Sequence, residues 1–368
     1  QTDAPDNASA GAETGFDVVL GNPPWDVLEF KEPEFFAVTK PSIANANSAE
    51  REEFVSKLPD TNPRLYKEYK QEKHFSNALN TYLRESGRYP LTAVGRMNTY
   101  VVFSELVRKI KGPKGRAGII VKSGIATDYT YRDFFGDTVE NQEIISLYDF
   151  ENREELFQGV DSRTKFCLLT LTGREAPGQE IDFAFFMTRP EQLTEEDRHF
   201  TLTPEELLQI NPNTGNSPVF RKRGDADLVR AIHRRVPVLV NERESSNPWG
   251  LDIRRIFNMG LSRVARDCLS SGEAENKERM ISRMYESKLM HQYSHRFATY
   301  ANGDPGYLNN EERADPNTLI VPRYWMPTQK VEETLRRNGW DRDWLLGWRD
   351  VCQPTDERTT IASILPRT

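Results

Sequence analysis

Short apolar runs separated by charged and turn-forming segments dominate the first 200 residues. The first run is Phe16 to Leu20, and it stops at Gly21. A short, continuous, β-prone run of this kind is typical of a strand buried on both faces of a parallel sheet. Further runs of the same kind predict strands at 117–121, 144–148, 166–171 and 181–186.

Helical patterns lie between these runs. From Asn98 to Lys111, apolar side chains recur at helical spacing, which predicts an amphipathic helix that covers the sheet; they are Tyr100, Phe103, Leu106, Val107 and Ile110. A shorter helix is expected at 133–139. The charged, helix-prone stretch 31–89 has the composition of an insertion carried on the sheet. Strands alternating with helices predict an α/β sheet domain over about 16–200.

The composition changes near a turn-rich segment at 211–216. Residues 217–368 hold 25 Lys+Arg and 21 Asp+Glu, whereas 1–216 hold 24 and 35. We therefore expect a tail without a core at 1–15, a first domain at 16–216 and a second at 217–368. The net charge of −7 argues against a nucleic-acid partner only as an average, because the second part is mildly basic.

The composition also restricts the class of protein. No apolar run approaches the roughly 18 to 20 residues that span a bilayer, the mean hydropathy is −0.68, and the opening residues hold no signal-peptide core. Cys167, Cys268 and Cys352 lie far apart, and no Cys/His cluster has metal-ligand spacing. We expect a soluble cytoplasmic protein with reduced thiols and no metal.

Asn22-Pro23-Pro24-Trp25, directly after the first predicted strand, carries the clearest chemistry. Ligands of open α/β sheets bind beyond the carboxyl ends of strands. The Asn22 side-chain oxygen and the Pro23 carbonyl could accept both hydrogens of an exocyclic amino group and localise its lone pair. The prolines stiffen the loop, and Trp25 offers a face on which an extruded base can stack. The same four residues could instead form an ordinary turn with a packing tryptophan.

This motif after a hydrophobic strand resembles the catalytic motif of S-adenosylmethionine-dependent amino-methyltransferases, and Phe16 to Gly21 resembles their adenine-specific DNA branch. Residues 118–124 are similar to the family's strand and loop beside the target base, although many members have proline at Lys122. Residues 156–166 resemble the segment whose aromatic packs on the other face of the base. The resemblance implies this role for Phe157, with Phe166 the alternative.

The second half resembles large single-chain bacterial methyltransferases of type IIG restriction–modification and related phage-defence systems, which implies a bacterial cytoplasmic protein. The blocks that carry this resemblance are 290–300, 344–350 and 356–359, so that the likeness covers about 16–368. It implies a partial Rossmann-like methyltransferase sheet followed by an α+β target-recognition domain that binds double-stranded DNA.

One expected element is missing. In this family an acidic, glycine-rich cofactor loop precedes the catalytic motif, and only fifteen residues precede Phe16 here. Gly112, Gly115 and Gly118 lie between a predicted helix and the next strand, the reverse of the order that places a cofactor at a helix N-terminus, and favour a tight turn. We therefore expect the half that binds S-adenosylmethionine to lie upstream or on another chain, and this chain to be inactive by itself.

Other residues admit two interpretations each. Seven cations are candidate DNA contacts, although charge clusters are usually solvated surface; they are Arg163, Lys165, Arg221, Lys222, Arg223, Arg234 and Arg235. His291 and His295 have the spacing of a metal pair on a helix, but without a third ligand a structural role is favoured. Trp340, Trp344 and Trp348 have the spacing of a helical core stripe.

Together these features predict a site-specific DNA methyltransferase that acts on the exocyclic N6 of a flipped adenine. Two alternatives stay open. The chain could be a DNA-binding specificity subunit without catalysis, as the missing cofactor loop suggests. It could also be an amino-methyltransferase for cytosine N4 or protein glutamine, because the same motif can hold those amino groups.

Overall fold

The computed structural model describes residues 15–258, 264, 267–270, 281–352 and 358–366. They belong to two compact units that divide between Leu251 and Asp252. The predicted tail, apart from Gly15, lies outside the described residues, as do Asp356 and Glu357 of the last sequence block.

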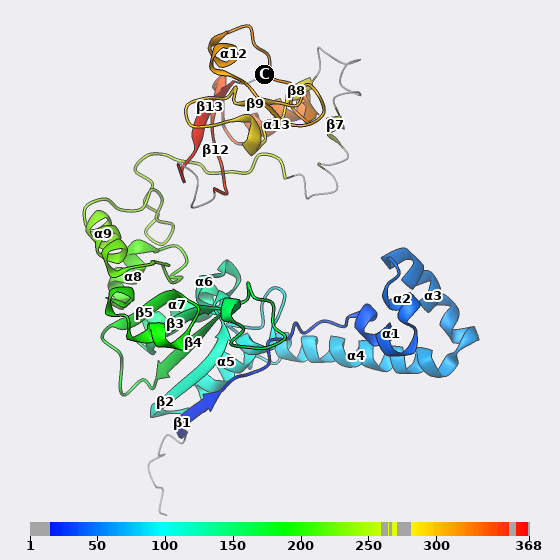
Figure 1. Cartoon of the computed structure of the whole chain (residues 1–368), viewed down its shortest axis with the longest axis vertical. Coiled ribbons are helices and arrows are strands. Elements are labelled where there is room, and N and C mark those ends of the chain that lie inside the picture. The colour runs from blue at the N-terminus through cyan, green and yellow to red at the C-terminus, as the bar shows by residue number, and fades with distance from the viewer. Residues whose placement is uncertain (1–14, 259–263, 265–266, 271–280, 353–357, 367–368) are drawn as a thin grey trace, which may run out of the picture. The chain divides into compact units, whose positions relative to one another are not determined.

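The first unit is built on a six-stranded mixed sheet with the order β1-β2-β4-β3-β5-β6 (Figure 1). Its strands are β1 (Phe16–Gly21), β2 (Lys111–Lys122), β3 (Ile144–Glu151), β4 (Lys165–Thr172), β5 (Ile181–Met187) and β6 (Phe200–Leu202). Strands β1, β2, β3 and β5 run in one direction, and β4 and β6 run against them. The predicted α/β class and all five predicted strands are confirmed. The carboxyl ends of the four parallel strands meet at one edge, together with the start of β4.

Helices pack on one face of this sheet and share its main hydrophobic core. They are α5 (Thr99–Ile110), α6 (Gly124–Thr127), α7 (Arg132–Glu140), α8 (Pro204–Ile210) and α9 (Arg223–His233), with 3₁₀ turns at Tyr129–Tyr131, Asn152–Glu154, Pro190–Thr194 and Glu196–Arg198. Helices α5 and α7 confirm the predicted helices at 98–111 and 133–139. On the opposite face a smaller cluster gathers around Phe150, Phe166 and Met187.

The charged stretch 31–89 forms four helices, α1 (Glu32–Thr39), α2 (Pro41–Ala44), α3 (Ser48–Thr61) and α4 (Pro63–Glu85). They have a small core of their own around Phe36 and Tyr69. The last turns of α4 contribute Leu83 to the main core, and the Asn80 side chain donates to the Leu28 carbonyl at 2.7 Å. The helical insertion predicted from composition is therefore tied to the sheet through the end of α4.

Strand β1 departs from the prediction that it is buried on both faces. It is the edge strand and pairs only with β2 among the described residues. Phe16, Val18 and Leu20 are 62%, 61% and 78% exposed, and only Val19 packs against the core. The apolar run predicted the strand correctly, but the burial of a strand depends on whether other elements pack beside it and on its faces.

Three glycines predicted to form a turn lie instead within β2. A Cβ at Gly115 would lie 2.4 Å from the Phe16 carbonyl oxygen, and one at Gly118 would lie 2.9 Å from the Leu20 side chain. Their small size lets β1 approach β2 closely, and Gly112 likewise faces Gly15. These glycines therefore serve strand packing and form no cofactor loop.

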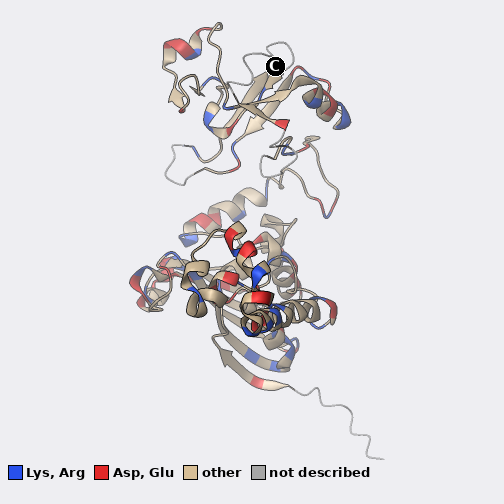
Figure 2. Cartoon of the chain, turned by 90° about the vertical axis from the view of Figure 1, so that its right-hand side faces the viewer, with Lys and Arg blue, Asp and Glu red and all other residues tan. Residues whose placement is uncertain are grey.

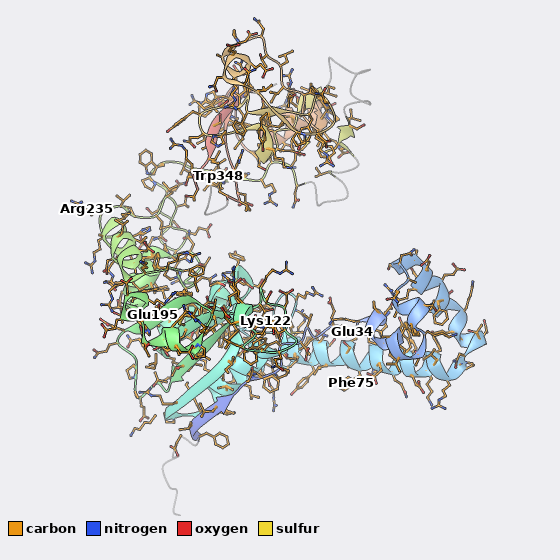
Figure 3. The ribbon with its side chains drawn as sticks, in the orientation of Figure 1. Glu34, Phe75, Lys122, Glu195, Arg235 and Trp348 are labelled. Carbon is orange, nitrogen blue, oxygen red and sulfur yellow. The ribbon has the colours of Figure 1, made fainter. Side chains whose placement is uncertain are left out.

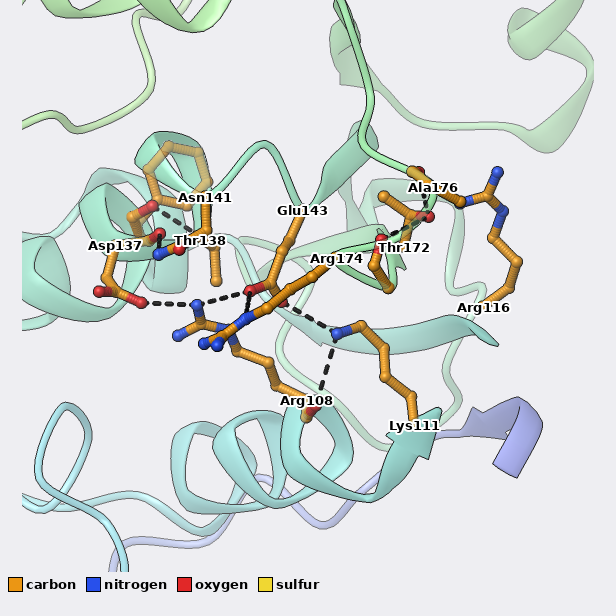
Figure 4. A network of polar contacts seen from close by, with 12 residues as sticks. Arg108, Lys111, Arg116, Asp137, Thr138, Asn141, Glu143, Thr172, Arg174 and Ala176 are labelled. Atoms are coloured by element: carbon orange, nitrogen blue, oxygen red, sulfur yellow. Dashed lines mark hydrogen bonds and ion pairs between the residues drawn. The ribbon is translucent and has the colours of Figure 1, made fainter. Parts of the chain in front are cut away.

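A buried ion-pair network joins several elements of the sheet unit (Figure 4). Glu143 accepts from Arg108 at 2.8 and 2.9 Å, from Lys111 at 2.9 Å and from Arg174 at 3.3 Å. Burial alone would raise the pKa of the Glu143 carboxyl, but the hydrogen bonds from Arg108 and Lys111 outweigh it and lower the pKa to about 2.

The described part of the second unit contains short antiparallel sheets and the helices α12 and α13. Its elements are β7 (Leu269–Ser270), β8 (Ile281–Arg283), a 3₁₀ turn (Ser287–Leu289), β9 (Ala298–Thr299), β10 (Gly306–Tyr307), α12 (Asn310–Ala314), β11 (Tyr324–Pro327), α13 (Thr328–Arg337), β12 (Trp344–Trp348) and β13 (Ala362–Pro366). Strand β11 lies between β7 and β8, and β12 pairs with β13.

The prediction that the tryptophan stripe is helical and buried is wrong on both points. Trp344 and Trp348 lie on strand β12, where they are 39% and 44% exposed (Trp348 is labelled in Figure 3). Residues four apart also share one face of a strand, so the spacing alone could not separate the two structures.

The boundary between the compact units lies later than the predicted one at 216/217. Helix α9 places Ala226 in the main core of the sheet unit, and Phe220 packs against the same core. Residues 217–251 contain seven Lys+Arg and four Asp+Glu, whereas 252–368 contain 18 and 17. Most of the basic excess predicted for the second domain therefore belongs to the first unit.

Basic and acidic residues are interspersed on both units in the view of Figure 2. No helix in the described part of the chain is long and apolar enough to cross a membrane.

Candidate functional site

The Asn22-Pro23-Pro24-Trp25 loop begins where β1 ends, at the carboxyl edge of the sheet. Asn22 is exposed and Pro23 is half-buried. Within the described part of the chain, no hydrogen bond engages the Asn22 side chain or the Pro23 carbonyl oxygen. Both acceptors required by the sequence hypothesis are therefore free for a ligand.

The second half of the same loop is held by the first residues of α5. The Thr99 hydroxyl donates to the Pro24 carbonyl at 2.5 Å and accepts from the Asp26 amide at 3.0 Å. The Asn98 side chain donates to the Trp25 carbonyl at 3.2 Å, and the Thr99 amide donates to Asp26 at 2.8 Å. This clamp fixes the backbone after Pro23 and leaves the two free acceptors at its upstream end.

The clamp leads to a local prediction. Thr99→Val removes the hydroxyl that joins Pro24 to Asp26, so the loop should open more often, with a loss of about 1 kcal/mol in local stability. Hydrogen exchange should show faster exchange of the Asp26 amide. The Leu28 amide, which donates to Met97 and not to Thr99, is the internal control. Unchanged exchange at Asp26 would contradict the clamp.

Trp25 is half-buried and packs into the protein. Its indole nitrogen donates to the Ile120 carbonyl at 3.3 Å, and its ring stacks on Phe166 with centroids 5.9 Å apart. Its contact with Phe157 is edge-on, with centroids 5.3 Å apart and planes at 72°. Because these two rings touch at a steep angle, no base fits between them in this arrangement, and the sandwich of Trp25 and Phe157 stays a prediction.

A buried asparagine pins the loop that carries Phe157. The Asn152 side chain accepts from the Phe157 amide at 2.9 Å and donates to the carbonyls of Phe157 and Val160 at 3.0 and 2.9 Å. Asn152 is completely buried. The backbone at Phe157 is thus fixed, so a change in the aromatic contact must come from rotation of the Phe157 side chain.

The seven predicted DNA-contacting cations differ in their contacts within the chain. Most of the seven have partners within the chain: Arg163 pairs with Asp161, Lys222 with Asp197 and Arg234 with Glu206, and Arg223 donates to the carbonyls of His199 and Glu196. Arg235 follows α9 (Figure 3). Lys165 and Arg221 alone of the seven are brought together, each over the ring of Phe186.

Several residues of this edge were not predicted from the sequence. Asn98 and Thr99 could have been suspected, because asparagine before an apolar helical pattern is a common N-cap. Asp149, Asn152 and Phe186 carry no comparable signal, because their roles depend on neighbours distant in the sequence.

The predicted histidine pair is not arranged on a helix. The segment forms a tight bridge between His291 and Ser294, and burial lowers the pKa of His295. Among the residues that the structure describes, no group of three or more His, Cys, Asp or Glu side chains could hold a metal ion.

No protein-family model matches the chain, and no curated protein matches it in sequence. It is similar in structure to a chain of a type I restriction–modification system (TM-score 0.33, 14% identity, 65% of this chain and 44% of that chain). It is also similar to the type IIG restriction endonuclease BpuSI (0.28, 16%, 60% and 20%) and to DrdV in its DNA complex (0.27, 13%, 50% and 17%). The chain thus spans less than half of each of these chains. Because all three TM-scores are below 0.5, these similarities carry no functional argument, and the function is inferred from the site and its motif.

Proposed function

We propose that this chain is the target-binding part of a site-specific DNA methyltransferase, which transfers a methyl group from S-adenosylmethionine to N6 of a flipped adenine in restriction–modification or phage defence. The observation that supports it best is the pair of free acceptors, Asn22 and Pro23, on a clamped loop at the carboxyl edge of the sheet.

The chemistry assigned to this loop follows from the electronic structure of adenine. The lone pair of N6 is delocalised into the ring, so the amino group is a poor nucleophile. Acceptance of both amino hydrogens by the Asn22 Oδ1 atom and the Pro23 carbonyl favours a lone pair localised on nitrogen. The clamp by Asn98 and Thr99 presets the loop, so little reorganisation is needed when the base arrives. The amino proton leaves to solvent after transfer, so no strong base is required.

The proposal requires a flipped base, because N6 inside a duplex cannot reach an enclosed site. Trp25 is the nearest aromatic in sequence to the acceptors, and its edge contact with Phe157 occupies the region that a base would need. We infer that the Phe157 side chain rotates away when the base enters, while Asn152 keeps its backbone in place.

The described residues do not fit the cofactor. Gly112, Gly115 and Gly118 are used in strand packing, and the described part of the chain contains no acidic, glycine-rich loop between a strand and a helix. S-adenosylmethionine would supply the methyl group, and we propose that residues of an upstream segment or a separate chain hold it.

The exposed side of β1 is the surface we assign to that cofactor-binding half. An edge strand with three exposed apolar side chains is an open template for another strand. Leu20→Lys should therefore reduce methylation by the assembled enzyme at least tenfold, because a buried unpaired charge would disrupt the contact. Val38→Lys, at a 90% exposed residue of α1, is the matched control. Equal methylation activity of Leu20→Lys and wild type would contradict the assignment of β1 as the surface that binds the cofactor-binding half.

Incubation of the complete enzyme with labelled donor and DNA, followed by nucleoside analysis, tests the function directly. We expect label in N6-methyladenine. Label in N4-methylcytosine or in protein would support the other amino-methyltransferases. A specificity subunit without catalysis, favoured by the absence of the cofactor loop from the described residues, would give no label while DNA binding persists.

A further inference from the structure

Strand β5 contains a strained residue at the carboxyl edge of the sheet. Its pairing with β3 shifts between Tyr148↔Ala184 and Phe150↔Met187, so β5 carries one extra residue there. Within this bulge Phe186 has φ +60°, a strained conformation that bulky residues rarely adopt. Bulges beside functional sites commonly redirect a side chain.

A buried carboxylate holds the strained backbone. The Phe186 amide donates to Asp149 Oδ2 at 3.2 Å, and the Ser123 hydroxyl donates to Asp149 Oδ1 at 2.5 Å. Asp149 is 3% exposed, and burial raises the pKa of its carboxyl against the effect of these two hydrogen bonds. The ends of β2, β3 and β5 are thus joined at this position, which keeps Phe186 on the same face of the sheet as Phe185.

Two cations pack against the Phe186 ring that this bulge presents. The Lys165 ammonium lies 4.9 Å from the Phe186 ring centroid, and the Arg221 guanidinium carbon lies 4.2 Å from it. The two positive groups are therefore no further apart than the sum of these distances. Neither pairs with a carboxylate within 4.0 Å among the described residues, and both are exposed. Glu151, which lies opposite Lys165 across β3 and β4, pairs with Arg153.

The backbone at both cations is anchored. The Lys165 carbonyl accepts from the Ser123 amide at 3.3 Å. Arg221 lies between Phe220, which packs against the core, and Arg223, which donates to two backbone carbonyls. Burial raises the pKa of the nearby Asp149 carboxyl, and the charge of Lys165 acts against this effect. Neither Lys165 nor Arg221 forms an ion pair within 4.0 Å among the described residues, however, and two such cations on fixed backbones have the character of an anion site.

We propose that Lys165 and Arg221, positioned by Phe186 and Asp149, together bind one backbone phosphate of the DNA. This proposal rests on the proposed DNA substrate and assigns the contact to these two of the seven candidate cations. The site lies at the same edge of the sheet as the Asn22 loop, where a phosphate contact would set the register of the duplex relative to the acceptors.

The dependence of DNA affinity on salt tests this assignment. The dissociation constant of the protein for a duplex oligonucleotide is measured between 50 and 200 mM salt, where each phosphate contact contributes about 0.9 to the slope of log K against log salt. The variant Lys165→Ala/Arg221→Ala should lower the magnitude of this slope by about 1. The matched control, Lys114→Ala/Arg243→Ala, removes two charges that have acidic partners, Glu175 and Glu140. A slope equal to that of the control, or no DNA binding by wild type, overturns the proposal.

A second variant tests the role of the strained aromatic. Phe186→Gly accepts the positive φ without strain but removes the ring under both cations, so DNA affinity should fall about tenfold, the effect of one charge-assisted hydrogen bond. Wild-type affinity of Phe186→Gly would overturn its positioning role. If DNA binding shows the expected salt response but nucleoside analysis finds no methylated adenine, the phosphate site stands and the proposed methyltransferase function fails.

Discussion

Replacing Asn22 by alanine is expected to reduce adenine methylation by the complete enzyme at least about 10²-fold, the loss typical when one preorganised polar contact to a reacting group is removed. Alanine cannot accept an amino hydrogen, and Pro23 alone does not localise the lone pair of N6. The loss should appear in kcat, because the contact is needed most in the transition state.

Fold and DNA affinity should survive this substitution. The Asn22 side chain is exposed and makes no hydrogen bond within the described residues, so its removal leaves no buried group unsatisfied. Asn77→Ala, at an exposed asparagine on α4, is the matched control and should methylate normally. Near-normal methylation by Asn22→Ala, with unchanged DNA binding, would contradict the role of the loop.

Glu143→Gln is expected to lower the free energy of unfolding of the sheet unit by about 3 kcal/mol at pH 7, because it leaves buried cations without their counter-charge. The Glu143 side chain is 1% exposed, and its partners Arg108 and Lys111 are 8% and 4% exposed. Arg108 keeps a second partner, Asp137, at 2.5 Å, so Lys111 is the cation most affected. Urea unfolding followed by circular dichroism measures the difference.

The difference in free energy of unfolding between wild type and Glu143→Gln should depend on pH in a definite direction. The pKa of Glu143 is lowered from 4.5 to about 2 on folding, so the ionised carboxylate stabilises the native state above about pH 4.5. This contribution is lost as the pH falls from about 4.5 towards 2, so the gap between wild type and Glu143→Gln should narrow over that range. Glu140→Gln, whose partner Arg243 is exposed, should differ from wild type by less than about 1 kcal/mol. A gap that widens in acid would contradict the role of Glu143.

The local sequence was sufficient for five strands and two helices of the sheet unit and for the position of the motif. Continuous apolar runs predicted β1 to β5, and helical spacing predicted α5 and α7, because these patterns report one chain segment and its neighbours in sequence. The same reasoning placed Asn22 to Trp25 directly after a strand, where the structure has it.

Exposure and partnership were decided by tertiary structure. The N-cap pattern could point to Asn98 and Thr99, but the contacts of Asn98, Thr99 and Asn152 with loop residues follow from no spacing rule. Lys165 and Arg221 share the ring of Phe186 only because the fold brings these distant segments together. The sequence alone also could not separate paired cations such as Arg234 from unpaired ones, since an ion pair depends on which side chains the fold brings within a few ångströms.

Local sequence patterns therefore predict a set of strands, helices and one chemically distinctive loop. Tertiary structure alone decided that β1 is an exposed edge, that the basic segment 217–251 belongs to the sheet unit, and that Trp25 contacts Phe157. The physical reason is that backbone preference and hydrophobic periodicity act over a few neighbouring residues, whereas burial and charge pairing depend on segments far apart in the chain.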